Sequence, residues 1–264
     1  PYSLSSLGTE SEAEKISVAT LTKHYREVIQ TSPIEIFYSG SAEYKDVKMA
    51  VMSSFSALPR AERFSEIFTA GSKKKEQGEI KIIEEKMSDI TQGKLSIGIR
   101  LGDNYRKQSL AVLSVFDAVF GGAVTSKLFT NVREKLSLCY YASSSYDFSK
   151  GVMIVGSGID SKNFQVAKDE ILLQFEKTKA GDITAAELEN AKRKIKNDLM
   201  RVSDGQSSSE IYYIDRFSNG IFFSPEEMVM FVENVTVGDI VKLGESAFVD
   251  TVYFLSGKGD GDGK

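Results

Sequence analysis

Histidine and cysteine are the side chains most often used to bind zinc or to activate a nucleophile, and the 264-residue chain has one of each, His24 and Cys139. A structural zinc site needs about four Cys or His ligands, and most catalytic zinc sites need at least two histidines. The chain therefore cannot build either kind of zinc site alone. A Ser-His-Asp or Cys-His arrangement would have to use His24, because there is no other imidazole. A single cysteine also excludes a disulfide within the chain.

The position of His24 favours a structural role. It lies beside the apolar stripe of a helix that the spacing of Ile16, Leu21, Tyr25 and Val28 predicts over residues 12–30. An imidazole at such a place is more often a surface or partly buried side chain than a catalytic group. We therefore assign no chemistry to it.

The charge pattern excludes several classes of protein. The 33 basic and 37 acidic side chains give a net charge of −4, which argues against a nucleic-acid binder. The basic run at 73–75 fits a solvated linker better than a contact with an anionic partner. Neither nucleotide-binding glycine motif is present, no segment approaches the ~20 apolar residues of a membrane span, and residues 1–15 do not resemble a signal peptide. The expected compartment is the cytoplasm.

The elements that must position any functional side chain fall into two groups. Over the first 70 residues the pattern predicts helix–strand–helix, with helices at 12–30 and 42–57 and a strand at 34–38. The polar segment 60–78 is the best candidate boundary. Further strands are predicted at 79–87, 93–102, 139–146, 151–159 and 251–255, and helices at 106–120, 126–135, 162–179 and 184–199 and starting at 224 and 236.

This order indicates an α+β fold, a largely antiparallel sheet covered by helices. The alternation of Leu95, Ile97, Ile99 and Leu101 with smaller or polar residues is typical of a half-buried strand. The pair Gly121-Gly122 is expected to end the preceding helix in the left-handed conformation.

The segment from Phe120 to Tyr146 resembles the signature of the pitrilysin/insulinase-like zinc peptidases, the M16 family, which includes the mitochondrial processing peptidases. The non-zinc domain of that family has the pattern GG-x-x-x-S-x-L-F-x-x-[LV]-R-E-K-x-G-L-x-Y. The residues that match it are Gly121, Gly122, Ser126, Leu128, Phe129, Val132, Arg133, Glu134, Lys135, Leu138 and Tyr140. The usual glycine is Ser137 here, a departure that concerns the turn. Weaker similarity extends over nearly the whole chain.

The resemblance implies a place within a larger enzyme. The catalytic half of the family carries H-x-x-E-H on a helix, which this chain lacks. Residues 1–70 are then expected to be the end of a first domain, and 71–264 the second, non-metal domain. The resemblance implies no cofactor in this chain, with zinc held by the complete enzyme or by a partner.

Within that second domain the resemblance assigns Arg133 and Tyr140 an auxiliary catalytic role. They would hold the substrate backbone and stabilise an oxyanion, since a guanidinium and a phenol are hydrogen-bond donors at any working pH. Gly121, Gly122 and Phe129 are implied to contact substrate, and no residue is implied to bind metal. The structural alternative is that Arg133 pairs with an acid on its own helix and Tyr140 is a core aromatic residue.

Two functions remain open. The chain is expected to be the non-zinc portion of an M16-type metallopeptidase, contributing peptide binding and the Arg133/Tyr140 pair to a chamber whose zinc lies in another domain or subunit. The alternative is a catalytically inactive peptide-binding or scaffold subunit. Either implies a peptide and a zinc-bearing M16 domain or subunit as partners, in a homo- or heterodimer, and the acidic, cysteine-poor composition fits a bacterial protein. Alone, the chain is expected neither to bind zinc stoichiometrically nor to cleave peptides.

Overall fold

The computed structural model describes residues 7–60, 77–88, 90–102 and 109–257. The chain divides into two compact units, residues 1–69 and 70–264, called here the amino-terminal and carboxy-terminal units. The lysine run at 73–75, most of the polar segment 60–78 and the glycine-rich tail lie outside the described residues. No helix in the part of the chain that the structure describes is long and apolar enough to cross a membrane.

The amino-terminal unit consists of short helices whose apolar faces are exposed. They are α1 (Glu10–Ala13), α2 (Val18–Thr31) and α3 (Tyr44–Phe55), and none has a buried residue. The single helix predicted over 12–30 is wrong, because Ser17 forms a second capping box and restarts the helix. The strand predicted at 34–38 is also wrong. A strand needs a neighbour to pair with, and the described residues of this unit contain no other.

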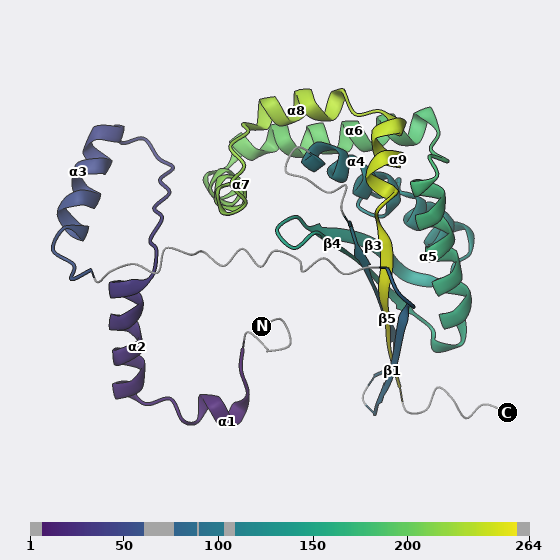
Figure 1. Cartoon of the computed structure of the whole chain (residues 1–264), viewed down its shortest axis with the longest axis horizontal. Helices are drawn as coiled ribbons and strands as arrows, with labels where there is room; N and C mark the ends of the chain where they lie inside the picture. The colour runs from purple at the N-terminus through teal and green to yellow at the C-terminus, as the bar shows by residue number, and fades with distance from the viewer. Residues whose placement is uncertain (1–6, 61–76, 89, 103–108, 258–264) are drawn as a thin grey trace. The chain divides into compact units, whose positions relative to one another are not determined.

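The carboxy-terminal unit is built on one five-stranded sheet with the order β1-β5-β2-β4-β3 (Figure 1). The strands are β1 (Lys81–Met87), β2 (Gly93–Arg100), β3 (Cys139–Asp147), β4 (Val152–Ile159) and β5 (Phe248–Gly257). Strand β1 runs parallel to β5, and the other three pairings are antiparallel. The predicted α+β class and largely antiparallel sheet are confirmed. The parallel pairing of β1 was not predicted.

Helices follow the predicted order with one addition. They are α4 (Leu110–Phe120), η2 (Leu128–Lys135), η3 (Ser161–Asn163), α5 (Phe164–Lys179), α6 (Ala185–Met200), η4 (Arg201–Asp204), α7 (Gln206–Ser218), α8 (Pro225–Glu233) and α9 (Val237–Gly244). Capping boxes start α6 and α8, as predicted, and the predicted start at Thr236 also forms one, with Asp239. Helix α7 was not predicted, because its first five residues, Gln206 to Glu210, are all polar and leave too short an apolar pattern to mark a helix.

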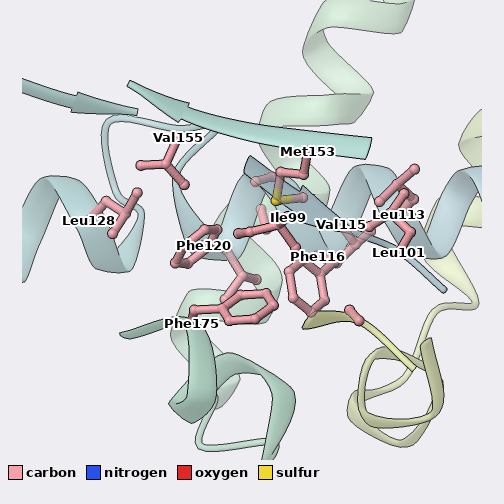
Figure 2. Packing of buried hydrophobic residues seen from close by; sticks show 14 of the residues in the cluster. Ile99, Leu101, Leu113, Val115, Phe116, Phe120, Leu128, Met153, Val155 and Phe175 are labelled. Carbon is pink, nitrogen blue, oxygen red and sulfur yellow. The ribbon is translucent and has the colours of Figure 1, made fainter. Parts of the chain in front are cut away.

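The core of this unit lies between the sheet and the helices. On β2, the side chains of Leu95, Ile97 and Ile99 are buried while their neighbours are not, which confirms the predicted half-buried strand. Figure 2 shows Ile99 and Met153 of the sheet beside Phe116 and Phe120 of α4 and Phe175 of α5. The three phenylalanine rings lie 5.6–6.3 Å apart, centroid to centroid. On the opposite face of β2, Lys94 is exposed and the other residues are partly buried.

Candidate functional site

The short helix η2 presents Phe129 and Arg133 on its outer side. It is a π-helix of eight residues, held down by the buried side chains of Leu128 and Val132. π-Helical turns often occur at functional sites. The Arg133 guanidinium lies 4.7 Å from the centroid of the Phe129 ring, a cation–π contact that restricts the orientation of the charge.

The Arg133 guanidinium is not engaged in a close ion pair among the described residues. Its side chain is 41% exposed, and the acid nearest to it is the adjacent Glu134, with 3.8 Å between Nε and Oε1. That separation is too long for a hydrogen bond, and exposed pairs of this kind contribute little. The structural alternative was that Arg133 pairs with an acid on its own helix. The long contact with Glu134 leaves most N–H donors of the Arg133 guanidinium available.

Four hydrogen bonds hold η2 in place, two of them to other helices of the unit. Lys127 Nζ donates to Glu187 Oε1 of α6 at 2.8 Å, and Asn131 Nδ2 donates to Gln174 Oε1 of α5 at 3.0 Å. The Leu138 NH donates to the Val132 carbonyl at 3.2 Å, which ties the exit of the helix back onto it. The Ser126 hydroxyl accepts from the Phe129 NH at the entrance. Arg133 thus projects from a fixed support.

Tyr140 is turned outward by a β-bulge. Cys139 lies opposite Ile159 and Tyr141 lies opposite Gly158, so Tyr140 is the extra residue of β3. In regular alternation with the buried Ala142, Tyr140 would point into the core. A bulge redirects the side chain, and Tyr140 is 74% exposed. The alternative that Tyr140 is a core aromatic residue is wrong.

An open groove of about 600 Å³ lies beside Tyr140. Its other lining residues come from the start of β2 and from the turn between β4 and η3: Thr91, Gln92, Ile159, Asp160 and Ser161. Burial raises the pKa of the neighbouring Cys139 thiol, and a hydrogen bond with Ser157 and the charge of Arg133 partly oppose this. Arg133 therefore acts electrostatically on the residue next to Tyr140. The groove residues were not predicted from the sequence, since they carry no motif.

The glycine pair is required for close packing. Gly121 ends α4 with φ −150°, so the predicted left-handed stop is wrong. A Cβ at Gly121 would lie 2.6 Å from the Ser144 nitrogen and 2.7 Å from Leu128 Cδ1, and one at Gly122 would collide with the Asp117 carboxylate. The Ser144 NH donates to the Gly121 carbonyl at 3.2 Å. The pair joins α4 to β3, and its contact with substrate stays a prediction, as does that of Phe129.

Ser137, where the family pattern has glycine, has φ +50°. Among the described residues it is the only one other than glycine with positive φ. The left-handed region costs a residue with a Cβ about 1 kcal/mol. The turn that links Arg133 to Tyr140 therefore keeps the conformation suited to glycine although the glycine is absent.

Asp117 is a partly buried acid at this junction that sequence reasoning missed. It accepts a 2.5 Å hydrogen bond from the Ser144 hydroxyl, and its carbonyl accepts from the NH groups of both Gly121 and Gly122. Burial raises the pKa of the Asp117 carboxyl to about 6, despite the Ser144 hydrogen bond and the charge of Lys194, which lower it. The only sequence signal is an acid within an otherwise apolar helix.

Asp117 should make the unit less stable at neutral than at acid pH. Because its pKa is higher in the folded than in the unfolded chain, its contribution is fully present below about pH 4 and is lost as the pH rises to about 6. We expect Asp117→Asn to raise the free energy of unfolding at pH 8 by about 2 kcal/mol and to change it little at pH 4. Urea denaturation of both proteins across this range measures the difference. An equal effect at both pH values would contradict the assignment.

The residues present do not fit a zinc ion. Among the described residues no group of three or more His, Cys, Asp or Glu side chains could hold a metal. His24 is exposed on α2 of the amino-terminal unit, and Cys139 lies on β3 of the other unit. Arg133 and Tyr140 themselves can offer hydrogen-bond donors.

A model of the family described as the Peptidase M16 inactive domain matches residues 15–195. The chain belongs to this family. The M16 resemblance of the Phe120–Tyr146 segment is thereby confirmed, and the segment lies within the matched region.

Two relatives match nearly the whole chain. The "probable inactive metalloprotease YmfF" of Bacillus subtilis is 34% identical over 97% of this chain and 59% of its own length. A conserved protein from Enterococcus faecalis has a structure with TM-score 0.84 and 27% identity, and the match covers 98% of this chain and 60% of that one. The chain thus spans about 60% of the length of these two relatives.

One structural match comes from an assembly. A chain in complex III2 of Candida albicans shares the fold with TM-score 0.70 and 15% identity, over 96% of this chain and 62% of that one. The same M16 fold therefore occurs within a multi-subunit complex.

Proposed function

We propose that the chain is the peptide-binding, catalytically inactive portion of an M16 homologue. The observation that carries this proposal is that Arg133, partly exposed, and Tyr140, exposed, lie on adjoining elements, and that Tyr140 lines an open groove. No zinc ligand set lies among the described residues, which both candidate functions expect, so this finding does not separate them. The description of YmfF as a probable inactive metalloprotease supports the inactive alternative.

Binding would use the two donors on peptide backbone carbonyls. The guanidinium is charged at any accessible pH and offers five N–H groups, and the phenol adds one O–H. Phe129 would orient the guanidinium through the stack described above and give an apolar surface to a peptide side chain. In this arrangement Gly121 and Gly122 act by letting α4 approach β3 closely enough to hold η2 in place.

The second candidate is that the same pair assists a zinc-bearing M16 domain or subunit, in a homo- or heterodimer. The exposed apolar side chains of the amino-terminal unit, among them Leu21, Tyr25 and Met52, favour it, because surfaces of this kind usually pack against another part of a protein. We propose that residues 1–69 form the last part of a first domain, and that another segment supplies the remainder of that domain. In such an assembly Arg133 would stabilise the developing oxyanion and affect kcat more than KM.

The main proposal predicts that Arg133 is needed for peptide binding and not for folding. A pool of unstructured 15-residue peptides with a fluorescent label, titrated with the full chain, gives affinities by anisotropy. Arg133→Ala should weaken binding about tenfold and Tyr140→Phe about threefold, the usual range for charged and neutral hydrogen bonds. The melting temperature should not change for either variant, because both side chains are exposed.

Arg201→Ala is the matched control, since Arg201 is also exposed but lies on η4. It should bind peptides as the unchanged chain does. Wild-type affinity in Arg133→Ala would contradict the proposed peptide site. Cleavage of the peptides by the purified chain, sensitive to Arg133→Ala, would contradict the inactive assignment and favour the second candidate.

A further inference from the structure

The groove beside Tyr140 is lined by hydrogen-bond donors that have no partner among the described residues. The Tyr140 hydroxyl and the Thr91 hydroxyl have none. Gln92 uses its amide oxygen to accept from Lys94 Nζ at 3.1 Å, which leaves the two N–H donors of its amide. Three neutral side chains therefore offer donors to one volume of about 600 Å³.

A positive charge lies next to one of these donors, Gln92. Lys94, Gly158 and Tyr141 are neighbours across the sheet, in one row over β2, β4 and β3. Because Gly158 has no side chain, Tyr141 and Gln92 can both lie over it; a Cβ there would be 2.6 Å from the Tyr141 ring and 3.1 Å from the Gln92 amide. The Lys94 ammonium lies 5.6 Å from the centroid of the Tyr141 ring and contacts Gln92. No acid among the described residues pairs with it.

The one acid that lines the groove forms an ion pair. Asp160 lines the groove, and its exposed carboxylate is 2.8 Å from Lys162 Nζ. Arg133, on the neighbouring helix, lies over the Phe129 ring, and its ion-pair contact among the described residues is with Glu134, at 3.8 Å. Lys162 therefore offsets part of the charge of Asp160, whereas Lys94 beside Gln92 has no acid partner among the described residues.

We infer that this groove is a carboxylate-binding subsite, which takes either the C-terminal carboxylate of a bound peptide or an acidic side chain. The ligand would accept from Tyr140, Thr91 and the Gln92 amide, with Lys94 supplying the charge through Gln92 and directly. Charge-assisted hydrogen bonds are the strong ones in such sites. This inference rests on the proposed peptide-binding function and adds a preference to it.

Three peptides of twelve residues with one neutral fluorophore test the inference on the full chain. The first has a C-terminal amide and a central Gln, the second has the same sequence with a free C-terminal acid, and the third keeps the amide and has Glu in place of Gln. We expect the second or the third to bind about tenfold more tightly than the first. Whichever does so identifies the source of the carboxylate. Equal affinities for all three would overturn the inference.

Two variants connect that preference to the groove. Lys94→Met, which keeps the aliphatic stem, should reduce the preference to less than about twofold without changing affinity for the neutral peptide. Gln92→Glu, which keeps the side-chain length, should abolish it. Lys196→Met removes the same charge from an exposed lysine on α6 and should leave the preference intact. An equal loss in Lys196→Met would overturn the inference, because the preference would then reflect net charge.

Different results would contradict the carboxylate subsite and the proposed peptide-binding function. If the neutral peptide binds and no acidic peptide binds better, the carboxylate subsite is wrong and peptide binding stands. If none of the three peptides binds, the proposed function is wrong and this inference falls with it.

Discussion

Replacing Gly121 by alanine is expected to lower the free energy of unfolding of the carboxy-terminal unit by about 3 kcal/mol or more. The new Cβ would lie 2.6 Å from the backbone nitrogen of Ser144, closer than real Cβ contacts allow. Backbone cannot rotate away as a flexible side chain can, so α4 and β3 must separate. Their separation breaks the 3.2 Å hydrogen bond between the Ser144 NH and the Gly121 carbonyl and disturbs the contact with Leu128.

Gly98→Ala is the matched control for this change. Gly98 also belongs to the sheet region, but a Cβ there meets only the Thr251 carbonyl oxygen, at 3.9 Å. We expect the control to be neutral or to stabilise the unit by about 0.5 kcal/mol, since alanine loses less backbone entropy than glycine. Urea denaturation followed by circular dichroism compares the two. Equal stabilities of the two variants would show that the α4–β3 junction is not a close packing.

The features of the fold that the sequence predicts correctly are those determined by residues close together in the chain. The capping boxes at Thr184, Ser224 and Thr236 lie within four residues of the helix starts they mark. The strand β2 shows its buried face by simple alternation. The spacing of Arg133 and Tyr140 matches a family signature, and their assignment as site residues stays a prediction.

What could not be predicted depends on pairing between distant segments. The outward position of Tyr140 follows from a bulge against Ile159 and Gly158, which no local pattern reveals. The groove joins residues near 91 and 160, brought together only when β2 pairs with β4. Residues 34–38 have the composition of a strand but no partner among the described residues of their unit. The close packing of Gly121 was not predicted for the same reason, because Ser144 is distant in the sequence.

Glu187→Ala is expected to destabilise the carboxy-terminal unit by about 4 kcal/mol, because it removes two interactions at once. The first is the ion pair with Lys127, whose side chain is only 6% exposed and whose Nζ lies 2.8 Å from Glu187 Oε1. An unpaired buried ammonium accounts for about 3 kcal/mol. The second is the capping box, in which Glu187 accepts from the Thr184 NH at 2.8 Å, worth about 1 kcal/mol.

A double-mutant cycle separates these two effects. Lys127→Met replaces the ammonium with an apolar side chain of similar length, and in the Glu187→Ala background it should restore about 3 kcal/mol, since no buried charge is then left unpaired. Alone, Lys127→Met should cost much less than Glu187→Ala. Burial alone would raise the pKa of the Glu187 carboxyl, but the hydrogen bonds from Lys127 and Thr184 keep that pKa below its ordinary value. The contribution of the pair should therefore be present above the unfolded pKa and be lost as the pH falls through the folded one. Equal destabilisation by both single variants, with no recovery in the double variant, would show that Lys127 is solvated and does not anchor η2.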